Sequence, residues 1–542
     1  MKPFRPAAIA AALLLAGTAS AQEPVVAAPS GSVRGTREGD IRAFKGIPYA
    51  VPPVGGMRWR PPAPMQPWQG VRDARDFGPA CVQSQSKTPV SVYSPAAPLP
   101  VSEDCLTLNI WAPADAKKAP VFFWIHGGAL SGGSSREPMY DGRKMAEQGV
   151  IVVSINYRLG VLGWLAHPAL SAESPQKVSG NYGLLDQMAA LAWVKHNIAA
   201  FGGDPARVTI AGESAGGLSV MFLMESPLAR GTFGKAIAQS AYMVAMPELK
   251  KQAYGAPSAE AVGTMLAAGV QAPDLAALRG MDAQTLTDSA AKLGFFPFGV
   301  VDGLVLPTQM VDAFDQGRQA PVPILTGFNQ GEIRSLMVLA PKAPATAEEY
   351  EKSIREKYGE FADGFLKLYP AADYKESILA TSRDALYGWT TERLARKQAA
   401  IGQPAYVYLW DHGYPAMAAA GLHAFHASEL PYVFGNLAPL PPKWPVMPES
   451  DRPLSDAMLG YWTSFAKTGT PAAKDAAAWP AFGKDRDYLH ITDAPRAERG
   501  LMPGMYDQYE AVVCRRRAAG VAWNWNAGLA APKLPPKAPG CD

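Results

Sequence analysis

A serine between two glycines lies where a β-favouring run meets a helical one, and this junction constrains the fold more than any other stretch. The run Val208-Thr209-Ile210 leads into Gly212-Glu213-Ser214-Ala215-Gly216, and residues 218–224 favour a helix. Such a strand-to-helix turn is so tight that a Cβ would crowd the positions two before and two after the serine. Because Gly-x-Ser-x-Gly arises easily by chance in a chain with 51 glycines, the prediction depends on this strand-to-helix context.

Apolar strands alternate with helical stretches along most of the chain. Residues 183–201 have helical spacing, and residues 241–293 are expected to be helical as well. Strands are expected at residues 119–125, 150–156, 323–327, 405–410 and 488–492. This alternation predicts an α/β fold with a central, mostly parallel β-sheet flanked by helices.

The first 21 residues have the features of a secretory signal peptide. A basic start with Lys2 and Arg5 precedes an apolar run over residues 7–16 and the small residues Ala19-Ser20-Ala21. The apolar run is about half of the ~20 residues that cross a bilayer, which disfavours a retained anchor. We therefore expect an exported protein, periplasmic or secreted, with no integral membrane segment after cleavage.

Charge and composition limit the partners and the number of domains. The formal net charge of +3 falls to about +1 without Lys2 and Arg5, so nothing in it favours nucleic acid as a partner. Residues 22–528 contain no linker, repeat or charge block, whereas about 529–542 form a Pro-rich tail. We expect one large domain over residues 22–542, as a monomer or a weak homo-oligomer.

Export makes the four cysteines candidates for disulfide bonds. Three connectivities are possible. The two local pairs are favoured by spacing: Cys81 with Cys105, and less strongly Cys514 with Cys541.

The serine needs a base and a group that stabilises an oxyanion before it can act as a nucleophile. The amide of Ala215 and the glycine-rich loop His126-Gly127-Gly128-Ala129 are candidates for the oxyanion site, although the loop could be an ordinary turn. Four histidines follow the serine, and the strand context of His490 favours a structural role. Spacing alone leaves His412, His423 and His426 open as the base, and makes Glu332 only a weak candidate for the acid.

At this point the residues resemble a known family, the type-B carboxylesterases and cholinesterases of the α/β-hydrolase superfamily. The resemblance covers nearly the whole chain after residue 21. It is carried by Gly46-Ile47-Pro48-Tyr49-Ala50, Ser102-Glu103-Asp104-Cys105-Leu106-Thr107-Leu108-Asn109-Ile110-Trp111, Asn156-Tyr157-Arg158-Leu159-Gly160, Gly180-Asn181-Tyr182-Gly183, Gly327-Phe328-Asn329-Gln330-Gly331-Glu332 and His426-Ala427-Ser428-Glu429-Leu430-Pro431.

The resemblance implies a bacterial, secreted carboxylesterase of one elaborated domain. It selects Ser214 as nucleophile, Glu332 as acid and His426 as base, with an oxyanion hole of Gly128, Ala129 and Ala215. It implies no metal and no organic cofactor. It also pairs Cys81 with Cys105, but offers no clear precedent for Cys514 with Cys541.

Two departures from the family pattern affect the expected substrate. Ala129 stands where the family loop usually has a third glycine, so a left-handed backbone there would store about 1–2 kcal/mol of strain. Residues 82–104 contain Tyr93 but no tryptophan to bind a quaternary ammonium group, which disfavours choline esters. Glu213, Phe295 and Phe296 are candidates for the substrate pocket, although a buried structural role fits each of them equally well.

The expected activity is hydrolysis of small to medium uncharged carboxylic esters through an acyl-enzyme intermediate. The same triad could serve a specialised detoxifying, amide or carbamate hydrolase, because fold and triad do not fix the substrate. An inactive, cholinesterase-like adhesion protein is disfavoured, since such relatives typically lose a triad residue and this chain has all three.

Overall fold

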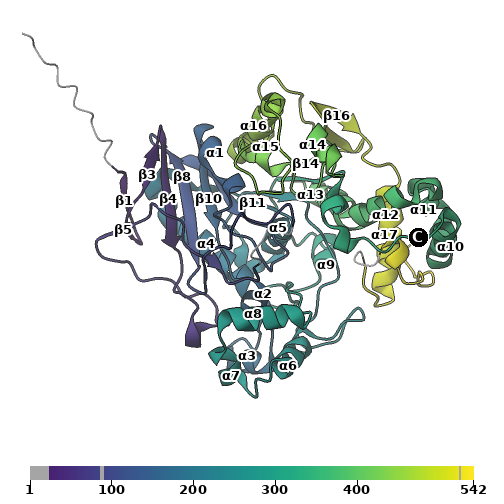
Figure 1. Ribbon diagram of the computed structural model, residues 1–542, viewed down its shortest axis with the longest axis horizontal. Helices are drawn as coiled ribbons and strands as arrows, with labels where there is room; N and C mark the ends of the chain where they lie inside the picture. The colour runs from purple at the N-terminus through teal and green to yellow at the C-terminus, as the bar shows by residue number, and fades with distance from the viewer. Residues whose placement is uncertain (1–22, 86–90, 524–526, 542) are drawn as a thin grey trace, which may run out of the picture.

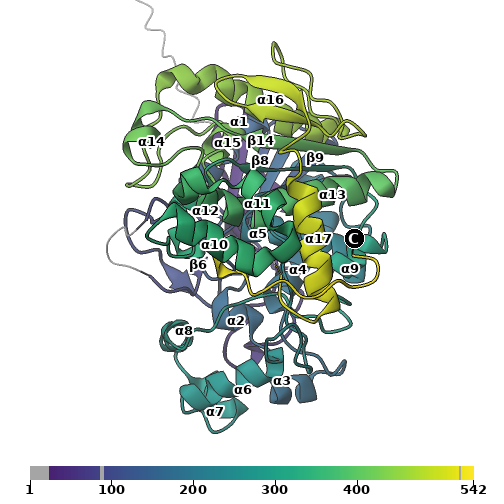
Figure 2. The ribbon, with the colours of Figure 1, turned by 90° about the vertical axis from the view of Figure 1, so that its right-hand side faces the viewer.

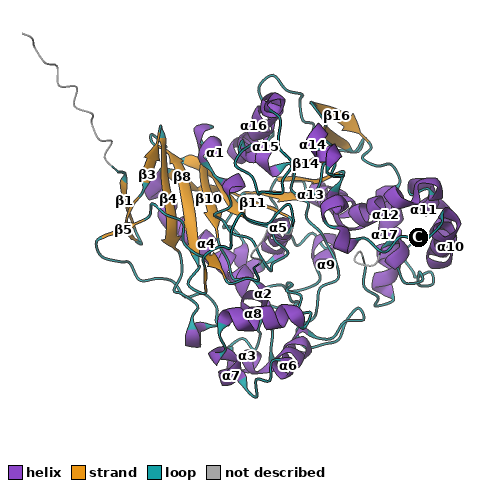
Figure 3. Cartoon of the chain, viewed as in Figure 1, coloured by secondary structure: helices purple, strands orange, loops and turns teal. Residues whose placement is uncertain are grey.

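An eleven-stranded β-sheet forms the centre of the protein (Figures 1 and 3). The computed structural model describes residues 23–85, 91–523 and 527–541, so the predicted signal peptide, residues 1–21, lies outside the described residues. In spatial order the strands are β16 (Pro495–Arg499), β15 (Asp487–Ile491), β14 (Ala405–Trp410), β13 (Ile324–Asn329), β12 (Lys235–Gln239), β11 (Gly203–Glu213), β9 (Ala119–Ile125), β10 (Ile151–Ile155), β8 (Thr107–Pro113), β4 (Ile41–Pro48) and β3 (Thr36–Glu38).

The middle of this sheet is parallel and its two ends are antiparallel. Every neighbouring pair from β10 to β15 is parallel, and Val121 of β9 aligns with Ile151 on one side and Val208 on the other. Antiparallel pairs join β10, β8, β4 and β3 at one end and β15 with β16 at the other. Parallel strands place their carboxyl ends at one edge, so the segments that follow β9, β11 and β13 meet there.

Helices cover both faces of the sheet, which explains why its central strands are continuously apolar. Alternate residues of β9 face opposite cores: Phe123 belongs to one and Trp124 to the other. The first core is covered by α4 (Tyr182–Asn197), α5 (Ala215–Glu225), α9 (Met310–Asp315) and α13 (Trp389–Ala400). The second is covered by α1 (Arg143–Glu147), α14 (Pro415–Ala419), α15 (Leu430–Phe434) and α16 (Arg452–Thr468).

The remaining helices form two groups away from the sheet (Figures 1 and 2). One group lies at the lower end of both views: α2 (Gly160–Trp164), α3 (Pro168–Glu173), α6 (Ala259–Gly269), α7 (Leu275–Gly280) and α8 (Ala283–Lys292). The other lies at the right of Figure 1: α10 (Ala347–Tyr358), α11 (Ala362–Leu368), α12 (Tyr374–Arg383) and α17 (Met505–Ala518).

The prediction of helix over residues 241–293 is wrong for the first part of that range. Residues 241–258 are irregular, and the first helix of this region begins at Ala259. Pro247 and Pro257 explain the difference, because proline lacks the amide that a helix interior needs and disfavours the helical conformation in the residue before it.

Two small sheets and two disulfide bonds complete the fold. The sheets consist of β1 (Val25–Ala28), β2 (Gly31–Arg34) and β5 (Val71–Asp73), and of β6 (Ala80–Cys81) with β7 (Val101–Ser102). Disulfide bonds join Cys81 to Cys105, and Cys514 of α17 to Cys541 of the Pro-rich tail. Within the described ranges, no helix has both the length and the apolar composition to span a membrane.

Candidate active site

Ser214 occupies the turn between β11 and α5, with a left-handed backbone at φ 56° and ψ −121°. The two flanking glycines, Gly212 and Gly216, are required by close contacts and not by a positive φ. A Cβ at Gly212 would collide with the backbone of Gly216, and a Cβ at Gly216 would collide with the carbonyl oxygen of Ile125 at the end of β9. The turn is therefore pressed against the neighbouring strand and leaves Ser214 half-buried on the wall of a cavity.

The glycine-rich loop after β9 passes directly over this turn. A Cβ at Gly127 would lie 3.2 Å from the Cβ of Ser214, so the loop and the serine are in close contact. Gly128 has φ 107° and Ala129 has φ 54°, which is the strained conformation expected for an alanine in this position. Gly128 and Ala129 line the same cavity as Ser214, and Ala215 begins α5 immediately beneath it. The arrangement brings the predicted oxyanion residues together around the serine.

Glu332 and His426 are in contact beside the cavity, which His426 lines and Glu332 does not. Glu332 lies on a 3₁₀ turn after β13 and is fully buried; its Oε2 contacts Nδ1 of His426, and its Oε1 accepts a hydrogen bond of 2.9 Å from the amide of Asn329. His426 is buried on the loop before α15 and also lines the cavity. The carboxylate therefore fixes the orientation of the ring from its Nδ1 side.

Glu213 lies next to the other ring nitrogen: its buried Oε1 is 3.0 Å from Nε2 of His426 but makes no hydrogen bond. Among the described residues, the structure shows no hydrogen bond from Ser214 to His426; catalytic hydrogen bonds are often loose until substrate binds. Burial raises the pKa of Glu213 well above its usual range, an effect that the charge of His426 opposes. Burial alone would lower the pKa of His426, but the carboxylates of Glu213 and Glu332 more than offset it and raise that pKa to about 9.

A third buried carboxylate, that of Glu429, lies three residues after the histidine. It accepts hydrogen bonds from the side-chain amides of Gln239 at 2.9 Å and Asn329 at 2.7 Å. The Asn329 amide also donates to the carbonyl oxygen of Phe425 at 2.8 Å, and Trp462 donates to Gln239 at 2.9 Å. This polar network, formed by Gln239, Asn329, Glu429 and Trp462, links both sides of the histidine loop to the sheet. The sequence does not reveal this network, because buried polar residues far apart in the chain leave no local pattern.

The cavity around Ser214, called here the active-site cavity, has a volume of about 530 Å³. Tyr93, Tyr242 and Tyr387 form much of its aromatic wall. The hydroxyl of Tyr93 donates a hydrogen bond of 2.9 Å to the carbonyl oxygen of His426, so the loop closed by the first disulfide contacts the histidine directly. A role for Tyr93 at the histidine was not predicted. Its place as the single aromatic residue between Cys81 and Cys105 was the available signal.

The two predicted pocket phenylalanines occupy different places. Phe296 lines the active-site cavity and is 56% exposed. Phe295 does not line it, because its amide donates to Ala290 while that of Gly294 donates to Ala291, which is the hydrogen-bond pattern that ends α8. This cap turns Phe295 toward the apolar cluster around α2 and α8, and its assignment to the pocket at Ser214 is corrected accordingly.

Comparison with known proteins agrees with this geometry. The chain matches the model of the carboxylesterase family over residues 22–509. It is 40% identical over 492 residues to the fumonisin B1 esterase of Sphingopyxis macrogoltabida, with 87% of each chain covered. It is 36% identical over 485 residues to the para-nitrobenzyl esterase of Bacillus subtilis (strain 168), covering 87% of this chain and 95% of that one.

Solved structures are similar over the same length. Two structures of PNB esterase superpose with TM-scores of 0.73 and 0.76, at 32% and 31% sequence identity. They cover 88% and 90% of this chain, and 98% and 99% of their own. By sequence and by fold, the chain belongs to the carboxylesterase family and is an ester hydrolase.

Proposed function

We propose that Ser214, Glu332 and His426 form the catalytic triad of a serine carboxylic-ester hydrolase. The observation that carries this proposal is the buried contact between Glu332 and Nδ1 of His426, in a cavity that Ser214 also lines. A carboxylate on Nδ1 holds the ring in the tautomer whose Nε2 can take a proton. When substrate binds, the carboxylate of Glu213 must move away from Nε2 of His426, so that the hydroxyl of Ser214 can donate its hydrogen bond there.

The reaction runs in two halves. Ser214 Oγ attacks the ester carbonyl while His426 takes its proton, and the oxyanion is received by the amides of Gly128, Ala129 and Ala215. His426 then gives the proton to the leaving alcohol oxygen as the carbon–oxygen bond breaks, which leaves an acyl group on Ser214. Water attacks this acyl-enzyme with His426 as base, and the carboxylic acid is released.

The substrates that we propose are small to medium uncharged esters. The cavity volume of about 530 Å³ and its apolar and tyrosine lining support this class. Within the described part of that lining there is no lysine or arginine that could pair with an acidic substrate, and the charged groups are Glu137, Glu213 and His426. A detoxifying, amide or carbamate hydrolase with the same triad is the alternative.

We propose that the protein is exported, to the periplasm or beyond the cell, after cleavage behind Ala21. The two disulfide bonds support an oxidising compartment. We further propose that residues 22–542 act as one domain, in a monomer or a weak homo-oligomer.

The test is a Ser214→Ala variant assayed with p-nitrophenyl acetate. We expect turnover to fall by roughly 10⁴–10⁶ with an unchanged circular dichroism spectrum. Ser174→Ala, at the end of α3, is the matched control and should retain full activity. A Ser214→Ala protein that keeps more than a tenth of the activity would place the nucleophile elsewhere.

A further inference from the structure

The hydroxyl group of Tyr93 joins the two segments that carry the proposed acid and base. It lies 2.5 Å from Oγ of Ser335 and donates a hydrogen bond of 2.9 Å to the carbonyl oxygen of His426. A tyrosine hydroxyl has one proton to donate, so it accepts the hydrogen bond from Ser335. Ser335 ends the 3₁₀ turn that begins at Glu332. One hydroxyl therefore bridges the turn of the acid and the loop of the base.

The same two segments are joined at a second place, before the acid and the base in the chain. The amide of Gly331 donates to the carbonyl oxygen of Ala424 at 3.0 Å, and the side-chain amide of Asn329 donates to that of Phe425 at 2.8 Å. In both segments these bonds come before the contact of the acid with the base, whereas the bridge through Tyr93 comes at or after it. The contact is therefore held on both of its sides along the chain.

The ring of Tyr93 is itself held by aromatic neighbours. It lies edge-on to the ring of His426 at 6.4 Å, and 6.5 Å from each of the rings of Phe425 and Trp444. Its backbone amide donates to Oγ of Ser91 at 3.2 Å. A tyrosine side chain has only two torsion angles, so a ring packed in this way leaves its hydroxyl little freedom. The hydroxyl is therefore a fixed point to which the backbone of His426 is tied.

We propose that Tyr93 is a positioning residue for ester hydrolysis, whose hydroxyl keeps the acid turn and the base loop at the spacing in which Glu332 meets Nδ1 of His426. This proposal rests on the proposed triad. Both hydrogen bonds of the hydroxyl go to protein atoms, so it acts on the reaction through His426 and not on substrate. Glu332 holds the side chain of His426 while Tyr93 holds its backbone, and together they set the direction of the ring. A displacement of about 1 Å can cost on the order of 10²-fold in rate, so the loss of this tie should be measurable.

The first test is Tyr93→Phe, which removes the hydroxyl and keeps the ring. We expect kcat for p-nitrophenyl acetate to fall by roughly ten- to hundredfold, because both halves of the reaction need His426. KM should change by less than about twofold, since the hydroxyl does not bind substrate. The matched control is Tyr414→Phe: that hydroxyl donates to the carbonyl oxygen of Pro445 at 2.8 Å in the same core, away from the cavity. The control should keep its kcat, and an unchanged kcat in Tyr93→Phe would overturn the proposal.

The dependence of kcat/KM on pH separates positioning from a general loss of stability. Burial lowers the pKa of His426, but the carboxylates of Glu213, Glu332 and Glu429 outweigh it and raise that pKa to about 9. A base loop that moves away from Glu332 loses part of this effect, so the rise in activity should move to lower pH in Tyr93→Phe. Tyr93 does not titrate in this range, because burial raises its own pKa well above the usual value. A lower kcat with an unmoved pH profile would show that the hydroxyl does not hold the acid and the base together.

Ser335→Ala tests the same bridge from its other end, and covers the case in which Tyr93→Phe does not fold. It removes the bond to the acid turn and leaves the bond to His426, so kcat should fall by less than in Tyr93→Phe. The double variant should be no slower than Tyr93→Phe alone, because both substitutions break one bridge. Losses that multiply in the double variant would show that the two hydroxyls act independently, which contradicts the bridge.

These outcomes are distinct from a failure of the proposed triad. If Ser214→Ala is inactive and Tyr93→Phe is fully active, the triad stands and the positioning role is refuted. If Ser214→Ala remains active, the triad itself is wrong, whatever Tyr93→Phe does.

Discussion

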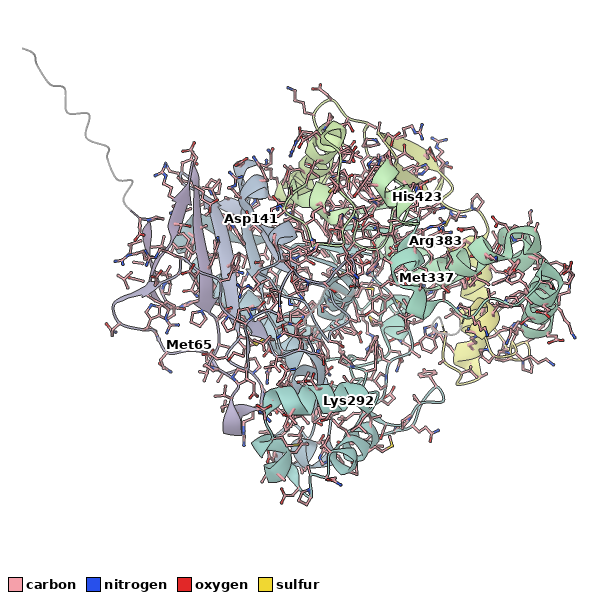
Figure 4. All side chains as sticks on the ribbon, viewed as in Figure 1. Met65, Asp141, Lys292, Met337, Arg383 and His423 are labelled. Carbon is pink, nitrogen blue, oxygen red and sulfur yellow. A yellow bond between two sulfur atoms is a disulfide. The ribbon has the colours of Figure 1, made fainter. Side chains whose placement is uncertain are left out.

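The floor and the outer wall of the active-site cavity are built in different ways. The floor consists of Ser214, residues 127–129 and His426, and its glycines are fixed by backbone contacts that leave no room for a Cβ. The outer wall includes Phe296 and, from the short 3₁₀ segment Met337–Leu339, Val338 and Leu339. Val338 is 90% exposed, and its neighbour Met337, labelled in Figure 4, is 58% exposed. Substitutions in the floor should therefore remove the chemistry, whereas substitutions in the wall should change which esters react.

The largest effect is expected in the floor, from His426→Ala. Loss of the base should lower turnover nearly as far as loss of the nucleophile, by roughly 10⁴–10⁶. His423, three residues earlier and labelled in Figure 4, is the control: it is half-exposed and pairs with Asp411 at 2.7 Å. His423→Ala should change turnover by less than about tenfold, within the range of an ordinary surface substitution. If the two results are reversed, the base is His423 and the floor is wrongly defined.

Removal of the first disulfide bond tests how the outer wall is held. Cys81→Ser with Cys105→Ser should lower the free energy of unfolding by about 2–4 kcal/mol, as measured by urea titration. The same loop carries Tyr93, so activity should fall with stability. Replacing Cys514 and Cys541 instead should spare activity, because that bond joins α17 to the tail, away from the cavity. A free thiol at Cys81 or Cys105 in mass spectrometry of the non-reduced protein would contradict the pairing.

The dependence of activity on pH tests the electrostatics of the floor. His426 must be neutral to accept a proton, so kcat/KM should still rise between pH 7 and pH 9, because its carboxylate neighbours raise its pKa to about 9. Glu213→Gln removes one of these negative charges, which lowers the pKa of His426 and moves the rise in activity to lower pH. Glu137→Gln, in the same cavity, serves as a control and should leave the profile in place. If Glu213→Gln leaves the dependence of kcat/KM on pH unchanged, Glu213 is uncharged over the whole pH range measured.

The smallest effect is expected where the floor meets the wall, at Ala129. Ala129 is exposed to the active-site cavity, has a left-handed backbone and belongs to the proposed oxyanion hole. Ala129→Gly should relieve about 1–2 kcal/mol of strain and widen this hole. The ratio of kcat/KM for a tertiary-alkyl acetate to that for a primary-alkyl acetate should rise several-fold. An unchanged ratio would remove Ala129 from the account of specificity.

The sequence predicted the parts of the molecule that local contacts determine. The turn at Ser214, the glycine-rich loop and the alternation of strands and helices each depend on neighbouring residues, and the mostly parallel sheet is confirmed. The choice of His426 needed the family resemblance, because spacing left His412 and His423 open. The helix predicted over residues 241–258 was wrong, because prolines interrupt that segment. Phe295 lies outside the cavity of Ser214 because of the cap that ends α8. The contact between Tyr93 and His426 was missed, because no periodicity in the sequence reveals a long-range contact.

The buried polar network behind His426 has an evolutionary consequence. Each of Gln239, Asn329, Glu429 and Trp462 satisfies a partner that is itself shielded from water. A single substitution leaves that partner without its hydrogen bond and lowers the free energy of unfolding by about 1–3 kcal/mol. Tolerated substitutions must therefore occur in compensating sets. These four positions should therefore vary together among homologous chains, and a double-mutant cycle of Gln239 with Glu429 should be strongly non-additive.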